Sequence, residues 1–353
     1  MGSFSGEILK VATFGESHGV GVGVVVEGVP AGIALEQEAI QAELDRRRPG
    51  TSPLASARQE ADQVEILSGV AEGRTLGSPI ALLVRNVDAR SKDYSALADK
   101  FRPGHADYTF WRKYGLPPQP GGGRSSGRET VGRVAAGAVA RALLAPLGVA
   151  IAAYTIQVGP VKATAIDPAF AREHPLRAAD PATAQAMVDE VMAARSDGDS
   201  VGGVLELAID GVPAGLGDPV FNKLDARLGG AMFSIGAVKW VEIGDGLAVA
   251  ARRGSANNDQ MDAKGFLSNH AGGILGGISN GMPLVLRLAI KPTPSIAQPQ
   301  RTQNLDGQAV EISIGGRHDP CLCGRIAPVA EAMAALVLAD LWLMQKTQAR
   351  SEA

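Results

Sequence analysis

Three of the five histidines lie beside glycine or acidic residues in segments without regular periodicity. His18 occurs in GESHG, His105 in RPGHAD and His318 in GRHDPC. Because the ordinary pKa of an imidazole is about 6.5, such a side chain can give or take a proton at neutral pH. These segments are therefore candidates for proton transfer, and a loop histidine that bonds only to backbone is the plainer alternative.

Several arginines occupy or adjoin loops that are rich in glycine or proline. They are Arg47, Arg102, Arg124, Arg128 and Arg317. Guanidinium groups pair bidentately with phosphate and carboxylate, and the glycine-rich loop before Ser126 delivers Arg124 to the start of a helix-like segment. Histidine among arginines suits the departure of a phosphate that must be protonated. The residues predict a polyanionic small-molecule site that eliminates or transfers phosphate, with surface ion pairs as the alternative.

Two other classes of protein compete with this interpretation. Gly15–Gly19 fits the G-x-S-x-G pattern of a serine hydrolase, but the segment that follows is strand-like rather than helical. A non-catalytic anion-binding module has the same residue types. Cys321 and Cys323 have no second pair to complete a zinc site, so we expect no metal and two ordinary thiols.

Composition narrows the class of protein further. The 353 residues are 45% hydrophobic and 20% charged with a net charge of −3, which excludes bulk disorder and a large basic field for nucleic acid. The N-terminus lacks the features of a secretory signal, so we expect a cytoplasmic protein. The apolar stretches Val134–Tyr154 and Ile326–Met344 contain charged residues, and we expect helices inside a soluble protein rather than membrane spans.

Periodicity and turn residues predict the elements that position these side chains. Expected strands cover residues 8–14, 20–29, 63–69, 79–86, 238–243, 283–290 and 310–314. Expected helices cover residues 35–48, 128–148, 182–195 and 328–345, and residues 87–106 form a long loop. In the first helix Arg47 shares a stripe with Ile40 and Leu44, so it should face inward while Arg46 and Arg48 do not.

The sequence contains an internal similarity. VVVEGVPAGI at 24–33 resembles LAIDGVPAGL at 207–216, and a helix-like segment follows each. We therefore expect one pseudo-symmetric domain over residues 1–353, with coincidence of a common turn as the alternative. The polar stretch 167–200 is an expected surface insertion, and 346–353 an expected flexible tail.

Several longer motifs are specific in order and spacing. They are GESHG at 15–19, DRRRPGTS at 45–52, RPGHADYT at 102–109, GGGRSSGRET at 121–130, SNHAGGILGGIS at 268–279 and GRHDPC at 316–321. Nearly the whole chain resembles the chorismate synthase family. The resemblance implies an α+β fold, a single-domain β-α-β sandwich, and a lyase that removes phosphate from 5-enolpyruvylshikimate 3-phosphate by 1,4-anti elimination. It also implies a requirement for reduced FMN (FMNH2) without net redox change.

The resemblance further implies roles for individual residues. Catalytic roles fall to His18, His105, Asp319, Ser17 and Ser126. Substrate anions would be held by His18, Arg47, Arg102, Arg128 and Arg317. FMN would be held by Arg124, Ser125, Ser126, Gly236, Ala237, Gly276, Lys291, Pro292, Thr293, Pro294, Ser295 and Arg317.

The chain departs from the family pattern at two places. Pro53 stands where many relatives have an arginine, and Gly236 and Trp240 stand in SIGAVKW where other residues are usual. These departures put one anion contact and one flavin contact in question. The family forms homotetramers, and because no separate nicotinamide-binding motif appears we expect an external flavin reductase rather than NADPH to supply reduced flavin.

Overall fold

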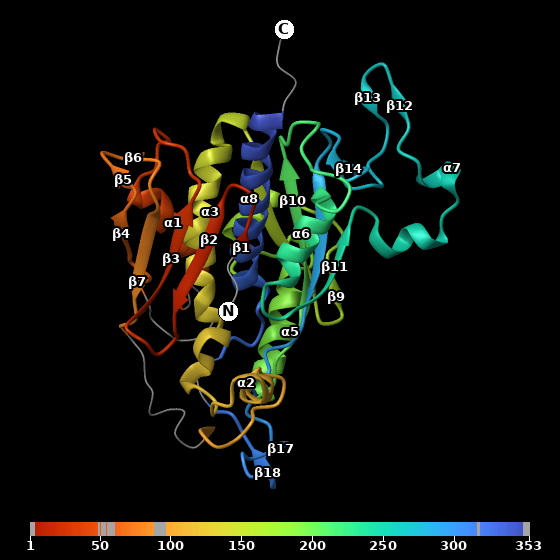
Figure 1. Cartoon of the computed structure of the whole chain (residues 1–353). Helices are drawn as coiled ribbons and strands as arrows, with labels where there is room; N and C mark the ends of the chain where they lie inside the picture. The colour runs from red at the N-terminus through yellow and green to blue at the C-terminus, as the bar shows by residue number, and fades with distance from the viewer. Residues whose placement is uncertain are drawn as a thin grey trace.

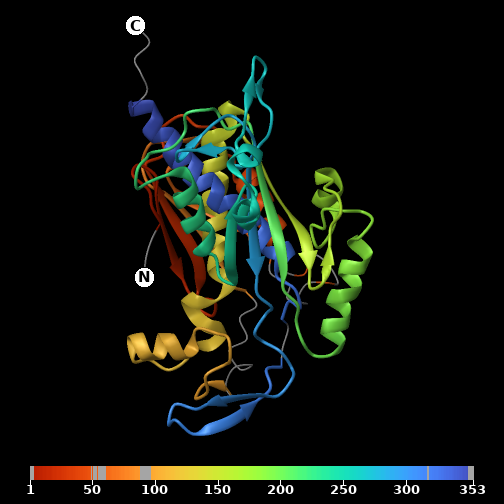
Figure 2. The ribbon, with the colours of Figure 1, turned by 90° about the vertical axis from the view of Figure 1, so that its right-hand side faces the viewer.

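The computed structural model describes residues 4–48, 50, 54, 61–87, 97–315 and 318–348. Two antiparallel sheets of five strands enclose a layer of helices (Figures 1 and 2). The first sheet has the order β1 (Phe4–Ser5), β2 (Lys10–Gly15), β3 (Gly21–Glu27), β7 (Ile80–Arg85), β4 (Val64–Ser68). The second has the order β11 (Val238–Ile243), β16 (Leu284–Ile290), β10 (Gly203–Asp210), β8 (Ala150–Val158), β9 (Val161–Lys162). The expected β-α-β sandwich is confirmed.

Four helices form the middle layer. They are α1 (Gln37–Arg47), α3 (Thr130–Leu144), α6 (Leu224–Phe233) and α8 (Cys323–Gln348). Helix α3 contacts β3 of the first sheet, and α8 contacts β8 and β10 of the second. A Cβ atom on Gly137 of α3 would lie 2.3 Å from the Cβ atom of Ala332 in α8. The absence of a side chain at Gly137 therefore allows the two central helices to approach closely.

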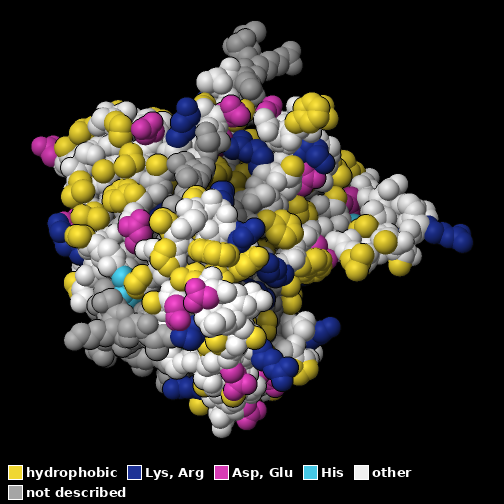
Figure 3. Space-filling view, turned by 60° about the horizontal axis from the view of Figure 1, so that its bottom comes forward, with side chains coloured by type: hydrophobic (Ala, Val, Ile, Leu, Met, Phe, Trp, Pro, Cys, Tyr) yellow, Lys and Arg dark blue, Asp and Glu magenta, His cyan; other side chains and the backbone are white. Residues whose placement is uncertain are grey.

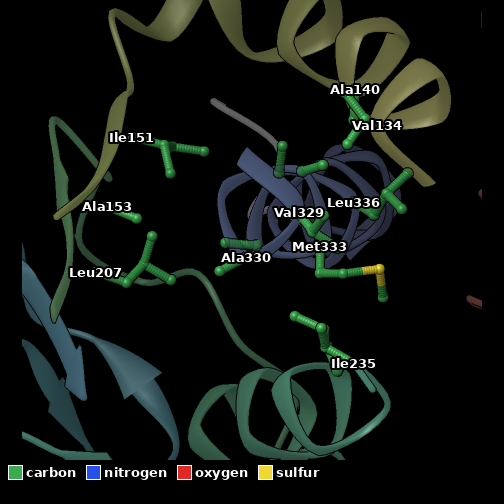
Figure 4. Close-up of a cluster of buried hydrophobic side chains, with 14 of the residues drawn as sticks. Val134, Ala140, Ile151, Ala153, Leu207, Ile235, Val329, Ala330, Met333 and Leu336 are labelled. Atoms are coloured by element: carbon green, nitrogen blue, oxygen red, sulfur yellow. The ribbon is translucent and has the colours of Figure 1, made fainter. Parts of the chain in front are cut away.

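The core is continuous from one sheet to the other. Figure 4 shows Val329, Ala330, Met333 and Leu336 of α8 surrounded by side chains from α3, β8, β10 and the end of α6. The stretches Gly127–Leu147 and Cys323–Thr347 are long and apolar enough to cross a membrane by length and composition alone. However, 61% and 94% of their apolar windows are buried inside the protein, as in the core helices of soluble proteins.

The two halves of the chain repeat one topology. The order β2-β3-β7-β4 in the first sheet matches β8-β10-β16-β11 in the second, and α1 and α3 correspond to α6 and α8. The hydroxyl of Thr75 accepts from Ile33 N at 3.0 Å and donates to Pro30 O at 2.6 Å. In the second half Ser279 accepts from Leu216 N at 2.9 Å and donates to Pro213 O at 2.6 Å. The GVPAG similarity is therefore a structural repeat and no coincidence.

The segment 167–200 interrupts the second repeat between β8 and β10. It contains α4 (Pro168–Glu173) and α5 (Ala184–Ser196), and α5 lies on the outer side of the second sheet (Figure 2). The corresponding connection in the first repeat is the short loop between β2 and β3.

The remaining elements are short and lie in the connections between the strands and helices described above. They are β5 (Val70–Ala71), β6 (Arg74–Thr75), α2 (Asp107–Tyr114), η2 (Pro120–Ser125), η3 (Gly127–Glu129), η4 (Ala145–Leu147), η5 (Gly246–Ala251), α7 (Gly254–Asn257), β12 (Met261–Asp262), β13 (Gly265–Phe266), β14 (Ile274–Leu275), β15 (Ile278–Ser279), β17 (Gln300–Gln303) and β18 (Ala309–Ile312).

Two expected helices have different bounds. The helix expected over Val134–Tyr154 ends at Leu144, because Pro146 and Gly148 terminate it, and the last residues belong to β8. Helix α8 begins at Cys323, five residues before Pro328. A proline near the start of a helix removes one backbone hydrogen bond, and the long buried face of α8 compensates for that loss. The helix extends to Gln348, into the range 346–353 that was expected as a tail, and 349–353 lie outside the described residues.

Candidate active site

One end of the sandwich gathers the loops that carry the histidines and arginines. The loop between β2 and β3, the residue after β7 and the segment after β16 all lie at this end, beside α2 and β17–β18 (Figure 1). Helices α3 and α8 both begin there. The GVPAG turns lie at the opposite end, because β3 and β10 run away from the loops. The site is therefore assembled from both repeats.

His18 lies in the loop between β2 and β3, against the triple-glycine loop. Its Nδ1 atom is 3.1 Å from the Oγ atom of Ser17, which also lies 3.4 Å from the carbonyl oxygens of Pro120 and Gly121. Gly121 has φ 62°, and a Cβ atom there would lie 2.2 Å from the His18 ring. Only glycine lets this loop approach the imidazole so closely.

Arg47 and Arg128 share one buried carboxylate, that of Asp62. Arg47 Nη1 donates to Asp62 Oδ2 at 2.8 Å, and Arg128 donates to Asp62 Oδ1. Arg47 is only 2% exposed, which confirms that it is the inward-facing arginine of the three. Arg128 also donates from Nε to Asn86 Oδ1 at 2.9 Å. One negative charge thus fixes two guanidinium groups and leaves the group of three with a net positive charge.

Arg102 and Arg124 are already engaged within the chain. Arg102 forms a bidentate pair with Asp107, at 2.7 and 2.8 Å, and both side chains are buried. Arg124 donates to Gly15 O at 3.0 Å and to Thr13 Oγ1 at 2.6 Å. Arg124 therefore holds the triple-glycine loop against β2, and the number of arginines in the sequence overstates the free positive charge.

His105 is joined to the segment that follows β16. Its Nδ1 donates to Pro103 O at 3.1 Å, since a carbonyl can only accept, and its Nε2 accepts from Ser295 Oγ at 2.8 Å. Burial lowers the pKa of His105 to about 4, and the positive charge of Arg102 adds to the shift. The imidazole is therefore neutral at pH 7, with its proton on Nδ1.

The segment 291–295 ties this histidine to the second repeat. Lys291 Nζ donates to Gly104 O at 2.7 Å, and Lys291 N donates to Ala237 O at 3.0 Å. Thr293 Oγ1 donates to Asp319 O at 2.6 Å. Gly236, Ala237 and Asp319 thus lie at the same end of the molecule as His105.

The other expected residues divide into three groups. Ser125 donates to Gly122 O at 2.7 Å, and Ser126 Oγ accepts from Arg128 N at 3.3 Å, at the start of α3. Gly276 lies between β14 and β15, at the Leu284 end of β16 and so at the end opposite Lys291. Arg317 and Pro53 lie outside the described residues.

Sequence reasoning missed the acidic partners and Asn86. Asp62 has a φ angle of 47° and lies just before β4. Asp107 lies two residues after His105, and Asn86 follows β7. A buried aspartate in a left-handed conformation is uncommon in proteins. The nearest signal for Asp62 in the sequence was its position, directly before the strand expected at 63–69 and after a stretch rich in proline, glycine and serine.

The hydrolase interpretation of Gly15–Gly19 is wrong. The loop joins two adjacent antiparallel strands, β2 and β3, whereas a nucleophile elbow joins a strand to a helix. The geometry that exposes the serine hydroxyl in a hydrolase is therefore missing at Ser17, which is 8% exposed.

Comparison with known proteins agrees with this arrangement. The family model for chorismate synthase matches residues 9–343. A chorismate synthase of Maridesulfovibrio salexigens is 54% identical over 345 residues, covering 98% of this chain and 99% of that protein. The one of Chloroflexus aurantiacus is 54% identical over 350 residues, covering 98% and 96%. A crystal structure of chorismate synthase superposes with a TM-score of 0.72 at 33% identity, covering 97% and 93%. The chain therefore belongs to the chorismate synthase family.

Proposed function

We propose that this protein forms chorismate from 5-enolpyruvylshikimate 3-phosphate by 1,4-anti elimination of phosphate, with reduced FMN bound and no net redox change. Membership of the family supports the reaction. The observation that carries the site is the convergence of the His18 loop with Arg47 and Arg128 at one end of the sandwich. The two arginines share the buried Asp62, and Asn86 joins Arg128 to Gly19 of the His18 loop. A histidine beside oriented guanidinium groups provides both a proton and anion binding for a departing phosphate.

We assign the substrate anions to Arg47, Arg102, Arg128 and Arg317. Buried carboxylates hold Arg47, Arg128 and Arg102 in fixed orientations, so little side-chain entropy is lost when the substrate binds. A guanidinium that faces a carboxylate on one edge still has N–H groups for a ligand on another edge. Preorganised donors of this kind stabilise the charge that develops as phosphate leaves.

We assign proton transfer to the departing phosphate to His18. The Ser17 hydroxyl lies 3.1 Å from Nδ1 and fixes one edge of the ring. Ser17 in turn is held near the carbonyl groups of the triple-glycine loop. Ser17 and Ser126 are therefore positioning residues in this proposal, and Ser126 acts through the backbone of Arg128.

The residues at this end fit reduced FMN in part. Lys291 has ammonium hydrogens beyond its bond to Gly104, and Ser125 is exposed, so a cation and a hydroxyl suit a phosphate group. When bound, reduced FMN supplies electron density that assists departure of the phosphate. We assign Arg124–Ser126, Gly236, Ala237, residues 291–295 and Arg317 to holding it.

Asp319 and the neutral His105 control protons beside this group in our proposal. The Asp319 carboxylate accepts from Arg325 Nη1 at 2.6 Å and is buried, so it is held as an oriented anion. His105 Nε2 accepts a hydrogen bond from the Ser295 hydroxyl, and that nitrogen is the one that can take up a proton.

We further propose that the protein is cytoplasmic and assembles as a homotetramer. Each chain would form one domain over residues 1–353, with 167–200 as an insertion. Large hydrophobic side chains are exposed on the second repeat, which supports self-association. They include Val220, Phe221, Leu247, Met261 and Leu267, and Phe221 is 95% exposed. A contact between Gly276 and FMN requires a second subunit, because Gly276 and Lys291 lie at opposite ends of β16.

Anaerobic turnover tests the activity. We would supply 5-enolpyruvylshikimate 3-phosphate with photoreduced FMN and follow chorismate absorbance and phosphate release. We expect product only with reduced flavin and a loss of at least about 100-fold in kcat for His18→Ala. Lys162→Ala, on the exposed strand β9, is the control.

A second arm replaces photoreduction with NADPH and oxidised FMN. No turnover is expected, since we propose that an external flavin reductase supplies reduced FMN. Absence of chorismate from folded protein under fully reducing conditions would overturn the proposed activity in favour of a non-catalytic anion-binding module.

A further inference from the structure

A cavity of about 260 Å³ lies behind Asp319, on the side of the molecule formed by the end of α1, the segment after α4 and the start of α8. Of the residues assigned to the substrate, His18, Arg47, Arg102 and Arg128 do not line it, and Arg317 lies outside the described residues. Five arginines and three carboxylates do, so the lining has an excess of positive charge. The arginines are Arg46, Arg48, Arg172, Arg177 and Arg325.

The arginines of this cavity differ in how well they are neutralised. Arg46 lies 2.7 Å from both Glu43 and Glu331, and Arg325 lies 2.6 Å from Asp319. Arg48 has only a longer contact with Asp45, at 3.6 Å. Over the part of the chain that the structure describes, the guanidinium groups of Arg172 and Arg177 have no hydrogen bond or ion pair. Two guanidinium groups thus face the cavity region without a carboxylate in contact.

Arg177 is held in place at a conformational cost. Its φ angle is 56°, and its backbone is fixed by bonds from its N to His174 O at 2.8 Å and from Thr155 N to its O at 2.7 Å. Burial and the charge of Arg46 lower the pKa of Arg177, and the charges of Glu331, Glu43 and Glu173 oppose that shift only in part. A strained, partly buried arginine beside a second cation is destabilising unless an anion compensates.

His174 contributes a neutral donor to the same cavity. Its Nδ1 accepts from Leu176 N at 3.3 Å and from Ala178 N at 3.4 Å, and burial lowers its pKa. The proton of the neutral ring therefore lies on Nε2. The cavity offers guanidinium forks and an imidazole N–H, which is the donor set for phosphate or carboxylate oxygens.

We propose that this cavity binds a small dianion, either inorganic phosphate or a compact dicarboxylate, through Arg172 and Arg177. Its volume suits a ligand of that size rather than a nucleotide. Arg325 and Asp319 both line the cavity and are paired with each other, so an anion in the cavity competes with Asp319 for this guanidinium. This second part rests on the proposed catalytic role of Asp319.

Equilibrium dialysis of phosphate against the full chain tests the binding site. Saturating 5-enolpyruvylshikimate 3-phosphate blocks the substrate site, and flavin is omitted so that no turnover occurs. We expect wild type to retain one bound phosphate, and Arg172→Gln with Arg177→Gln to weaken its binding at least about tenfold. The single variant Arg172→Gln changes an exposed side chain and guards against misfolding of the double variant. Arg253→Gln, which removes an exposed charge directly before α7, should leave phosphate binding unchanged.

Malonate in place of phosphate distinguishes the two sources of the dianion. If the double variant bound phosphate and malonate as tightly as wild type does, the proposed cavity site would be overturned. Failure of the proposed activity would give a different result. In that case the addition of 5-enolpyruvylshikimate 3-phosphate would displace no phosphate from wild type or from any variant. In turnover assays we expect phosphate to lower kcat of wild type and not of the double variant. An equal decrease in both would overturn the proposed competition with Asp319 for Arg325.

Discussion

The two repeats share a scaffold and differ at one end of it. At the GVPAG end, Thr75 and Ser279 form the same pair of hydrogen bonds in each repeat. At the other end, the first repeat has a short loop with His18, whereas the second has the segment 167–200 with two helices. The repeat is thus preserved where turns only close the strands and has diverged at the end where we propose the active site.

The difference also separates two uses of polar groups. Each hydroxyl of the GVPAG end satisfies a backbone donor and acceptor, and nothing remains for a ligand. At the site end, Asp62 and Asp107 neutralise arginines in part and orient them. Polar burial at one end therefore serves the fold, and at the other it prepares a binding site.

Replacing Asp62 should have the largest effect, because this carboxylate has no counterpart at the GVPAG end. Asp62→Asn removes the buried carboxylate charge that Arg47 and Arg128 share, and we expect a loss of about 3 kcal/mol in the free energy of unfolding. KM should rise as well. Urea unfolding and steady-state kinetics measure both, with Glu65→Gln, an exposed partner of Arg85, as control. Equal stability of the two variants would contradict the shared-counterion interpretation.

The pH dependence of stability is the next test of the site end. The pKa of His105 falls from 6.5 in the unfolded chain to about 4 in the folded one. Between these values the unfolded chain binds the proton more readily, so stability is full above pH 6.5 and is lost as the pH falls towards 4. We expect this group to account for about 3 kcal/mol across that window. His105→Gln should flatten that part of the curve in urea unfolding, and an unchanged slope would refute the prediction.

The matched hydroxyls test the symmetric end. Thr75→Val and Ser279→Ala each leave one backbone N–H and one carbonyl without a partner, and we expect each to cost about 1.5 kcal/mol. Thermal unfolding of both variants gives the comparison directly. If one variant is neutral and the other is not, the two turns are not equivalent, and the repeat is one of topology alone.

The smallest effect is expected in the insertion. Asp167 Oδ1 accepts from Ala169 N and Phe170 N, both at 3.0 Å, at the start of α4. Asp167→Ala should cost about 1 kcal/mol. Asp189→Ala, exposed on α5, is the control in the same denaturation series. A cost equal to that of the control would mean that α4 is held by packing alone.

Much of the fold was accessible from the sequence, since valine-rich alternation and glycine turns predicted β2, β3, β4, β7 and β16. The errors at α3 and α8 arose where an apolar run changes from helix to strand and where a proline lies inside a helix. Hydrophobicity alone does not separate a buried strand from a buried helix. Tertiary burial decides that assignment.

The sequence by itself determined which chemistry this chain could perform: histidines and arginines in glycine-rich loops, an inward Arg47, and two equivalent turns. These are local properties, since periodicity and turn chemistry depend on neighbouring residues. Only the tertiary structure decided which charged groups are already paired within the protein. The bonds of Arg124 to the backbone of β2 and the place of Asp62 between two arginines depend on how separate segments approach in space. Ion pairing requires contact within a few ångströms, and spacing along the chain does not specify that distance.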